Sequence, residues 1–195
     1  VSTDRRCYQE TQDVVLSGAG FRPRSTVTIT RQGTAIGTRP TDGDGAFVGK
    51  FPTRELRLPR REALFRLGAT DGTAVAQTSY QVTKVFADFA PGRGNLATLR
   101  VRFAVNGFAL LRARPGVFLH YVRPNGRVRR TVRLGTARGN CGHIKRTGRR
   151  RLFPFRAEPG RWILQFDTRR RYRRARQSSR FIWVRKPVQV FRPGG

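Results

Sequence analysis

Apolar and polar residues alternate with a period of two over much of the chain. In 26–30, valine and isoleucine alternate with threonine, and in 99–105 leucine, valine and phenylalanine alternate mostly with arginine. This period places apolar side chains on one face of an extended strand, and β-branched threonine suits the wetter face. No window has a sustained helical period, and a short helix is considered only for 167–180. The sequence therefore predicts an all-β fold.

The predicted strands are short and are separated by turn residues. Asp71-Gly72 and Asn125-Gly126 fit tight hairpin turns, because glycine and asparagine tolerate a positive φ. The strands are expected near 14–17, 26–31, 34–38, 46–51, 63–68, 74–82, 99–105, 117–122, 128–134, 152–155, 162–166, 181–184 and 188–191.

The order of strands and breaks predicts two domains. Residues 1–13 are polar and read as an N-terminal arm or leader strand, followed by a first domain in 14–84. A linker is expected in 85–95, where Pro91-Gly92-Arg93-Gly94 interrupts the pattern. A strongly basic second domain follows in 96–195 and repeats the plan of the first.

The first domain contains an apolar strand, a "GxGF" turn, an alternating Thr/Val strand and a "D-x-x-G-x-F" turn. The residues that carry this pattern are Gly18, Gly20, Phe21, Pro23, Val27, Ile29, Gly37, Thr38, Asp42, Gly45 and Phe47. The pattern resembles the immunoglobulin-like modules that occur, often in tandem, in secreted and surface proteins of high-GC bacteria. The resemblance covers residues 10–84. It implies two immunoglobulin-like antiparallel β-sandwiches in tandem and implies little about function, because such modules serve as spacers, adhesins and assembly units.

The composition fits a globular protein outside the membrane. The chain has 195 residues, of which 37% are hydrophobic, and no apolar run is long enough for a transmembrane helix. Methionine is absent and the sequence begins at Val1. We expect a mature, secreted or cell-surface protein, although a trimmed chain would look the same.

The charge is strongly basic and unevenly distributed. Residues 1–84 carry 13 basic and 8 acidic side chains, whereas residues 85–195 carry 28 and 3, within a formal net charge of +30. Codon bias can favour arginine over lysine but does not explain such a net charge. The basic second half therefore calls for an acidic partner, a neighbouring subunit or a role in solubility.

One arginine-rich strip is the main candidate site. Guanidinium groups present a planar fork to phosphate, sulfate or carboxylate, and a tyrosine can stack on a base or sugar ring. The strip could bind a polyanion, face acidic residues of an adjacent copy (Asp4, Glu10 or Asp13), or simply be a solvated loop. Its residues are Lys145, Arg146, Arg149, Arg150, Arg151, Arg169, Arg170, Arg171, Tyr172, Arg173, Arg174 and Arg176.

Cys7 and Cys141 are the only cysteines. In a secreted protein they permit one disulfide, which would close a loop of about 130 residues and contribute roughly 4–5 kcal/mol in the chain-entropy model. Two unrelated buried thiols and a bridge to a neighbouring copy are the alternatives.

Three further polar groups have simpler structural interpretations. Asp42-x-Asp44 lacks the other oxygen ligands of a calcium loop and is interpreted as a turn. Cys141-Gly-His143 lacks a third metal ligand, and we interpret its cysteine as half of a disulfide. His120 lies inside a strand and is expected to be packed or interfacial. We expect no metal and no cofactor.

Catalysis is not expected, because the second half offers few acids and histidines for paired proton transfer.

Two hypotheses about function follow. The first is a structural protein that assembles into a homo-oligomer, filament or surface layer, with the arms Val1–Asp13 and Val188–Gly195 completing a neighbour's sheet. The second is a module that binds nucleic acid or acidic polysaccharide through the arginine strip.

Overall fold

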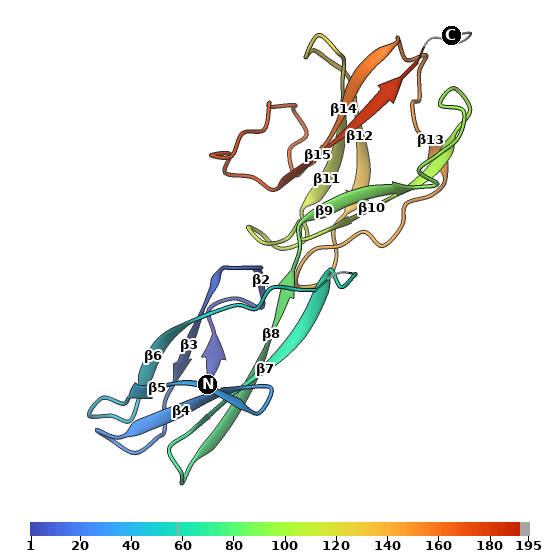
Figure 1. Cartoon of the computed structure of the whole chain (residues 1–195). Helices are drawn as coiled ribbons and strands as arrows, with labels where there is room; N and C mark the ends of the chain where they lie inside the picture. The colour runs from blue at the N-terminus through green and yellow to red at the C-terminus, as the bar shows by residue number, and fades with distance from the viewer. Residues whose placement is uncertain (58, 192–195) are drawn as a thin grey trace. The chain divides into compact units, whose positions relative to one another are not determined.

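The computed structural model describes residues 1–57 and 59–191, and this part of the chain is all-β, as the alternation predicts (Figure 1). Two units divide the chain, Val1–Lys84 and a second one that begins at Val85. The strands of the first unit are β1 (Ser2–Thr3), β2 (Cys7–Gln9), β3 (Asp13–Gly18), β4 (Thr26–Arg31), β5 (Thr34–Pro40), β6 (Phe47–Pro52), β7 (Glu62–Thr70) and β8 (Val75–Thr83). Those of the second are β9 (Phe86–Ala90), β10 (Arg100–Asn106), β11 (Gly116–Val122), β12 (Val128–Thr136), β13 (Arg150–Arg151), β14 (Gly160–Asp167) and β15 (Trp183–Val190).

The first unit has two sheets, with strand orders β1-β3-β6 and β2-β8-β7-β4-β5. Both contribute to one hydrophobic core, Val14 and Leu16 from β3 and Val27 and Ile29 from β4. These are the alternate apolar positions of each strand, because side chains of successive residues point to opposite faces.

The N-terminal arm is part of the first unit's own sheets. Strand β1 pairs with β3, and β2 pairs in parallel with β8. Tyr8 on β2 is fully buried, and its hydroxyl donates a hydrogen bond of 2.6 Å to Asp4 Oδ1. Of the C-terminal arm, residues 188–190 belong to β15 and residues 192–195 lie outside the described part. The N-terminal arm and residues 188–190 thus pair within the chain's own sheets.

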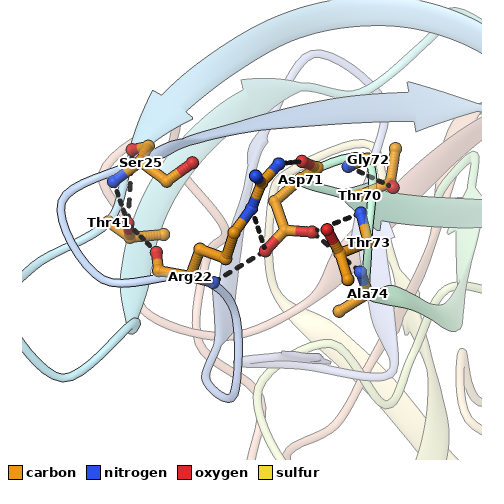
Figure 2. Close-up of polar contacts among 8 residues, drawn as sticks. All are labelled: Arg22, Ser25, Thr41, Thr70, Asp71, Gly72, Thr73 and Ala74. Atoms are coloured by element: carbon orange, nitrogen blue, oxygen red, sulfur yellow. Dashed lines mark hydrogen bonds and ion pairs between the residues drawn. The ribbon is translucent and has the colours of Figure 1, made fainter.

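A buried carboxylate ties two loops of the first unit together (Figure 2). Asp71, whose side chain is 1% exposed, accepts hydrogen bonds at Oδ2 from the backbone N–H of Arg22 and at Oδ1 from those of Thr73 and Ala74. The Arg22 guanidinium donates back to the Asp71 carbonyl. Thr41 fixes the other side of the same loop by donating to the Arg22 carbonyl at 2.7 Å. The Asp71-Gly72 turn is thereby confirmed as the connection between β7 and β8.

The second unit also has two sheets, β13-β10-β9 and β12-β11-β14-β15. Phe103 of β10 and Phe166 of β14 meet in its core with ring centroids 5.8 Å apart. Phe153 and Phe155 close one side of this core against Trp162, each at a centroid distance of 5.4 Å.

Four sequence predictions for the second unit differ from the structure. Residues 152–155 are not a strand, because Pro154 lacks an N–H and the flanking phenylalanines pack as described. The expected pair 181–184 and 188–191 is the single strand β15, an edge strand, where Pro187 needs no partner on the outer side. No helix forms in 167–180. The segment 85–95, predicted as a linker, contains β9 paired with β10.

Both cysteines are disulfide-bonded, so the only two cysteines of the chain form the bond Cys7–Cys141. A disulfide is compatible with an extracellular location. No helix in residues 1–57 and 59–191 has the length and apolar character needed to cross a membrane.

Candidate anion-binding face of the second unit

The sheet β12-β11-β14-β15 has one apolar face and one polar face. On β11, Leu119 and Tyr121 point into the core, so the alternate residues Phe118 and His120 lie on the outer face. Strand β14 follows the same rule, with Trp162, Leu164 and Phe166 in the core. Gln165 and Asp167 therefore share the outer face with His120.

A row of polar side chains crosses this outer face. Cross-strand pairing places Thr131 of β12 beside His120, His120 beside Gln165, and Gln165 beside Arg185 of β15. His120 Nδ1 lies 2.7 Å from Thr131 Oγ1, and His120 Nε2 lies 3.2 Å from Asp167 Oδ1. Gln165 Nε2 donates to Asp167 Oδ2 at 2.7 Å, and Arg185 Nε donates to Gln165 Oε1 at 3.1 Å. The row is a continuous hydrogen-bond network.

The network holds the loop 168–182, which connects β14 to β15 (Figure 1) and is called here the arginine loop. Asp167 Oδ1 accepts the Arg169 N–H at 2.7 Å, and His120 Nε2 lies 3.1 Å from the Arg169 carbonyl. Gln165 donates to the Arg173 carbonyl at 2.8 Å and accepts the Ala175 N–H at 3.2 Å. These backbone groups are satisfied by buried side chains rather than by a helical i→i−4 pattern, so the segment is a loop.

The proton positions on His120 follow from its partners. Nε2 faces a carboxylate oxygen and a carbonyl oxygen, which are both acceptors, so Nε2 carries a proton. In the neutral ring Nδ1 is then an acceptor and receives the Thr131 hydroxyl proton. This orientation turns the lone pairs of Thr131 Oγ1 away from His120.

The seven arginines of the arginine loop are all exposed. Within the described residues, none of them forms an ion pair with a carboxylate. Arg169 also lies over the Phe181 ring at 5.0 Å. The loop is thus fixed through its backbone, while its guanidinium groups face solvent. Tyr172, expected to stack on a ligand, instead packs half-buried against His120 with ring centroids 5.5 Å apart.

The rest of the predicted arginine strip belongs to the other sheet. Arg150 and Arg151 form β13 and pair with β10, and Arg149 Nε donates to the Arg100 carbonyl at 3.4 Å. Lys145 and Arg146 are exposed just before this strand. The strip that the sequence predicts is therefore two basic groups on different sheets.

Sequence reasoning missed a groove beside the arginine loop. This groove, of about 700 Å³, is lined by Arg112, Gly116, Phe118, Thr131, Arg133 and Arg170. Alternation along β11 could have placed Phe118 on the outer face. The approach of Arg112 and Arg170 depends on loop packing, which the local pattern does not encode.

The remaining candidates are structural. Asp42 Oδ1 accepts the N–H groups of Asp44 and Ala46, which makes the predicted turn. His143 exchanges backbone hydrogen bonds with Arg138, and Cys141 is in the disulfide. No cluster of three or more histidine, cysteine or acidic residues suited to a metal occurs in the part that the structure describes. His120 is fully buried, as its strand position predicts.

Comparisons with known proteins found likenesses to solved structures but no family. No protein-family model and no curated protein matches the chain. The chain is similar to dimeric latent PorU from Porphyromonas gingivalis, with 14% identity and a TM-score of 0.35 over 97% of this chain, and it spans 19% of the PorU chain. It is also similar to the CupB2 chaperone of Pseudomonas aeruginosa, with 11% identity and a TM-score of 0.25 over 96% of this chain and 98% of that one. Likenesses this weak carry no argument about fold or function.

Proposed function

We propose that this is a secreted, non-catalytic protein whose second unit binds polyanions, acidic polysaccharide or nucleic acid, through the arginine loop. The supporting observation is the arginine loop itself, whose backbone is held from beneath by His120, Gln165 and Asp167, while its arginines form no ion pair with a carboxylate of the described residues. A fixed backbone lowers the entropy that a basic loop loses when it binds a charged polymer. We also propose that each unit is an immunoglobulin-like sandwich, in line with two sheets around one core in each.

The series Asp167–His120–Thr131 has the order of groups found in a nucleophilic triad. A triad histidine must reach the leaving group of its substrate, and His120 is 0% exposed beneath the arginine loop. Asp167 also accepts hydrogen bonds from Arg169 and Gln165. These features support a positioning role for the series rather than a catalytic one.

The test replaces five arginines of the arginine loop (169, 171, 173, 174 and 176) by glutamine. Arg170 is kept because it lines the groove. The backbone bonds of the loop are unaffected by these changes, so the fold should persist. Binding to heparin and to single-stranded DNA should weaken at least about tenfold at low salt. For DNA, the slope of the logarithm of the binding constant against the logarithm of salt concentration should become shallower by about 0.7 for each phosphate contact removed.

A matched control removes the same charge from the first unit. The control replaces five exposed arginines there (24, 54, 57, 60 and 66) by glutamine. If binding depended only on net charge, both quintuple variants would weaken it equally. That result would contradict the assignment of the function to the arginine loop.

A second candidate function is self-assembly through edge strands. The described strands of both arms pair within their own unit, so we do not propose that they act as donor strands. Strand β6 is an edge of its sheet and carries Val48, 68% exposed, which favours pairing with another copy. Electron microscopy of the untagged protein at low and high salt tests this candidate. Ordered polymers lost in Val48→Lys would support it, and dispersed monomers at both salts would reject it.

A further inference from the structure

The groove on the outer face has a composition suited to a defined ligand. Three arginines line it, Arg112, Arg133 and Arg170, and each comes from a different segment of the second unit. In the described part of the chain none of the three is in an ion pair. Arg133 Nη2 donates to Thr136 Oγ1 at 3.1 Å, which leaves its other N–H groups available. The groove therefore favours a ligand with hydrogen-bond acceptors, preferably anionic ones.

At Thr131, by contrast, the ligand needs a hydrogen-bond donor. When His120 is neutral with its proton on Nε2, the Thr131 hydroxyl donates to His120 Nδ1 at 2.7 Å, and Oγ1 offers lone pairs to the groove. A matching ligand must then donate a hydrogen bond at this point. A free hydroxyl group meets this requirement, whereas a phosphodiester, carboxylate or sulfate does not.

The groove also has one aromatic lining residue, Phe118. Phe118 is half-buried on the outer face, and Gly116 leaves room beside its ring. A Cβ atom at residue 116 would lie 3.2 Å from Phe118 Cε2 and 4.0 Å from Arg133 Nε. Glycine thus keeps open the space beside the Phe118 ring, where the apolar face of another ring can pack.

Together these features match a ligand that has an anionic group, a ring and a free hydroxyl group. We propose that the groove binds an acidic sugar residue, through its carboxylate or sulfate at the three arginines, a hydroxyl at Thr131 and its ring face on Phe118. Its volume lies within the range of about 300–1,000 Å³ that is usual for small-ligand sites. This inference rests on the proposed function and names its ligand class.

DNA fits the groove less well than an acidic sugar does. A DNA strand offers phosphates to the arginines but no free hydroxyl along its backbone to donate to Thr131. Sequence-tolerant binding of single strands also uses successive aromatic platforms, and Phe118 is the one aromatic residue lining the groove.

Substitutions in the full chain that leave its net charge unchanged distinguish binding in the groove from general electrostatic attraction. Phe118→Ala removes the ring platform, and Gly116→Ala narrows the space in front of it at a residue without a positive φ. Titration calorimetry with tetragalacturonate should show about tenfold weaker binding for Phe118→Ala. The affinity for the DNA oligonucleotide (dT)5 should change less than about twofold. Phe191→Ala, at a side chain that is 76% exposed, is the matched control and should change neither.

The hydroxyl at residue 131 provides a second test. Thr131→Val keeps the shape of the side chain but removes the hydroxyl, which is both the acceptor towards the groove and the partner of His120 Nδ1, and should weaken tetragalacturonate binding about threefold to tenfold. Thr131→Ser keeps the acceptor and should bind like the wild type. Thermal unfolding by circular dichroism checks that each variant is folded.

The outcomes separate this inference from the proposed function. Unchanged tetragalacturonate binding in Phe118→Ala, Gly116→Ala and Thr131→Val, together with weakened binding in the variant of the arginine loop, would overturn the groove and leave the loop's role intact. Equal losses for tetragalacturonate and (dT)5 would overturn the preference for a sugar. Binding unaffected by the loop variant but weakened by Phe118→Ala would reject the proposed function and support the groove.

Discussion

In both units, buried polar side chains form hydrogen bonds with backbone groups of nearby loops. Asp71 in the first unit and Asp167 in the second are carboxylates that accept backbone N–H groups of nearby loops. A buried carboxylate without such donors would be costly, so each fixes the loop that supplies them. These residues decide local geometry without contributing to a hydrophobic core.

Asp71 should make the stability of the first unit depend on acid pH. Hydrogen bonds from the N–H groups of Arg22, Ala74 and Thr73 lower the pKa of Asp71 to about 2, from an unfolded value of about 3.9. The folded state therefore binds this proton more weakly, and the stabilisation is complete above pH 4 and lost as pH falls towards 2.

Denaturant unfolding of the wild type and of Asp71→Asn between pH 7 and pH 2 measures this effect. The variant should be less stable at pH 7, and the difference should shrink between about pH 4 and pH 2. Asp44→Asn, at an exposed carboxylate of the same unit, is the control. A difference between wild type and Asp71→Asn that stays constant over the range would contradict the assignment.

At the scale of elements, the arginine loop is ordered by the strands on either side of it. Strand β14 supplies Gln165 and Asp167, β11 supplies His120, and β15 begins where the loop ends. The loop makes these bonds through its backbone, so its side chains can vary without loss of the loop's conformation.

Asp167→Asn should release the arginine loop. An asparagine keeps the shape but replaces one acceptor oxygen by an N–H₂ group, so at least one of the donors from Arg169, His120 and Gln165 loses its partner. We expect a loss of about 1–3 kcal/mol in the free energy of unfolding and faster tryptic cleavage within 168–182. Limited proteolysis with mass spectrometry measures the second effect.

Asp88→Asn is the matched control for this prediction. Asp88 pairs with Lys186 at 3.5 Å, with both side chains at least 40% exposed, and such pairs contribute little to stability. Equal cleavage rates in Asp167→Asn, Asp88→Asn and the wild type would show that Asp167 does not hold the loop.

At the scale of the whole molecule, each unit has its own core, and the disulfide joins them covalently. Cross-linking two distant residues stabilises a chain by restricting its unfolded state, and more so for longer loops. Both cysteines are buried, at 5% and 1% exposure, but each unit also packs an extensive hydrophobic core of its own. Reduction should therefore leave both units folded but less stable.

Reduction should lower the free energy of unfolding by up to roughly 4–5 kcal/mol, because the bond closes a loop of about 130 residues. Denaturant unfolding with and without a phosphine reductant measures the loss, and peptide mapping without reductant identifies the Cys7–Cys141 peptide pair. The double variant Cys7→Ser/Cys141→Ser should not respond to reductant. An unchanged unfolding midpoint on reduction of the wild type would contradict the expectation.

The sequence by itself determined most of the strands, because the alternation of apolar and polar residues is a local property. The segment 26–31 is a strand with the expected inward Val27 and Ile29, and 117–122 lies within β11. Local turn chemistry likewise located the β7–β8 hairpin at Asp71-Gly72. These predictions succeed because neighbouring residues in the chain are enough to specify them.

Only the tertiary structure decided which strands pair and what covers each face. It merged most of the two expected strands 181–184 and 188–191 into the single edge strand β15, across Pro187, and it paired β2 with β8 in parallel and the N-terminal arm within the chain. It also divided the predicted arginine strip between two sheets and built a groove from residues far apart in sequence. Register and loop packing depend on contacts between distant segments, so no local period can encode them.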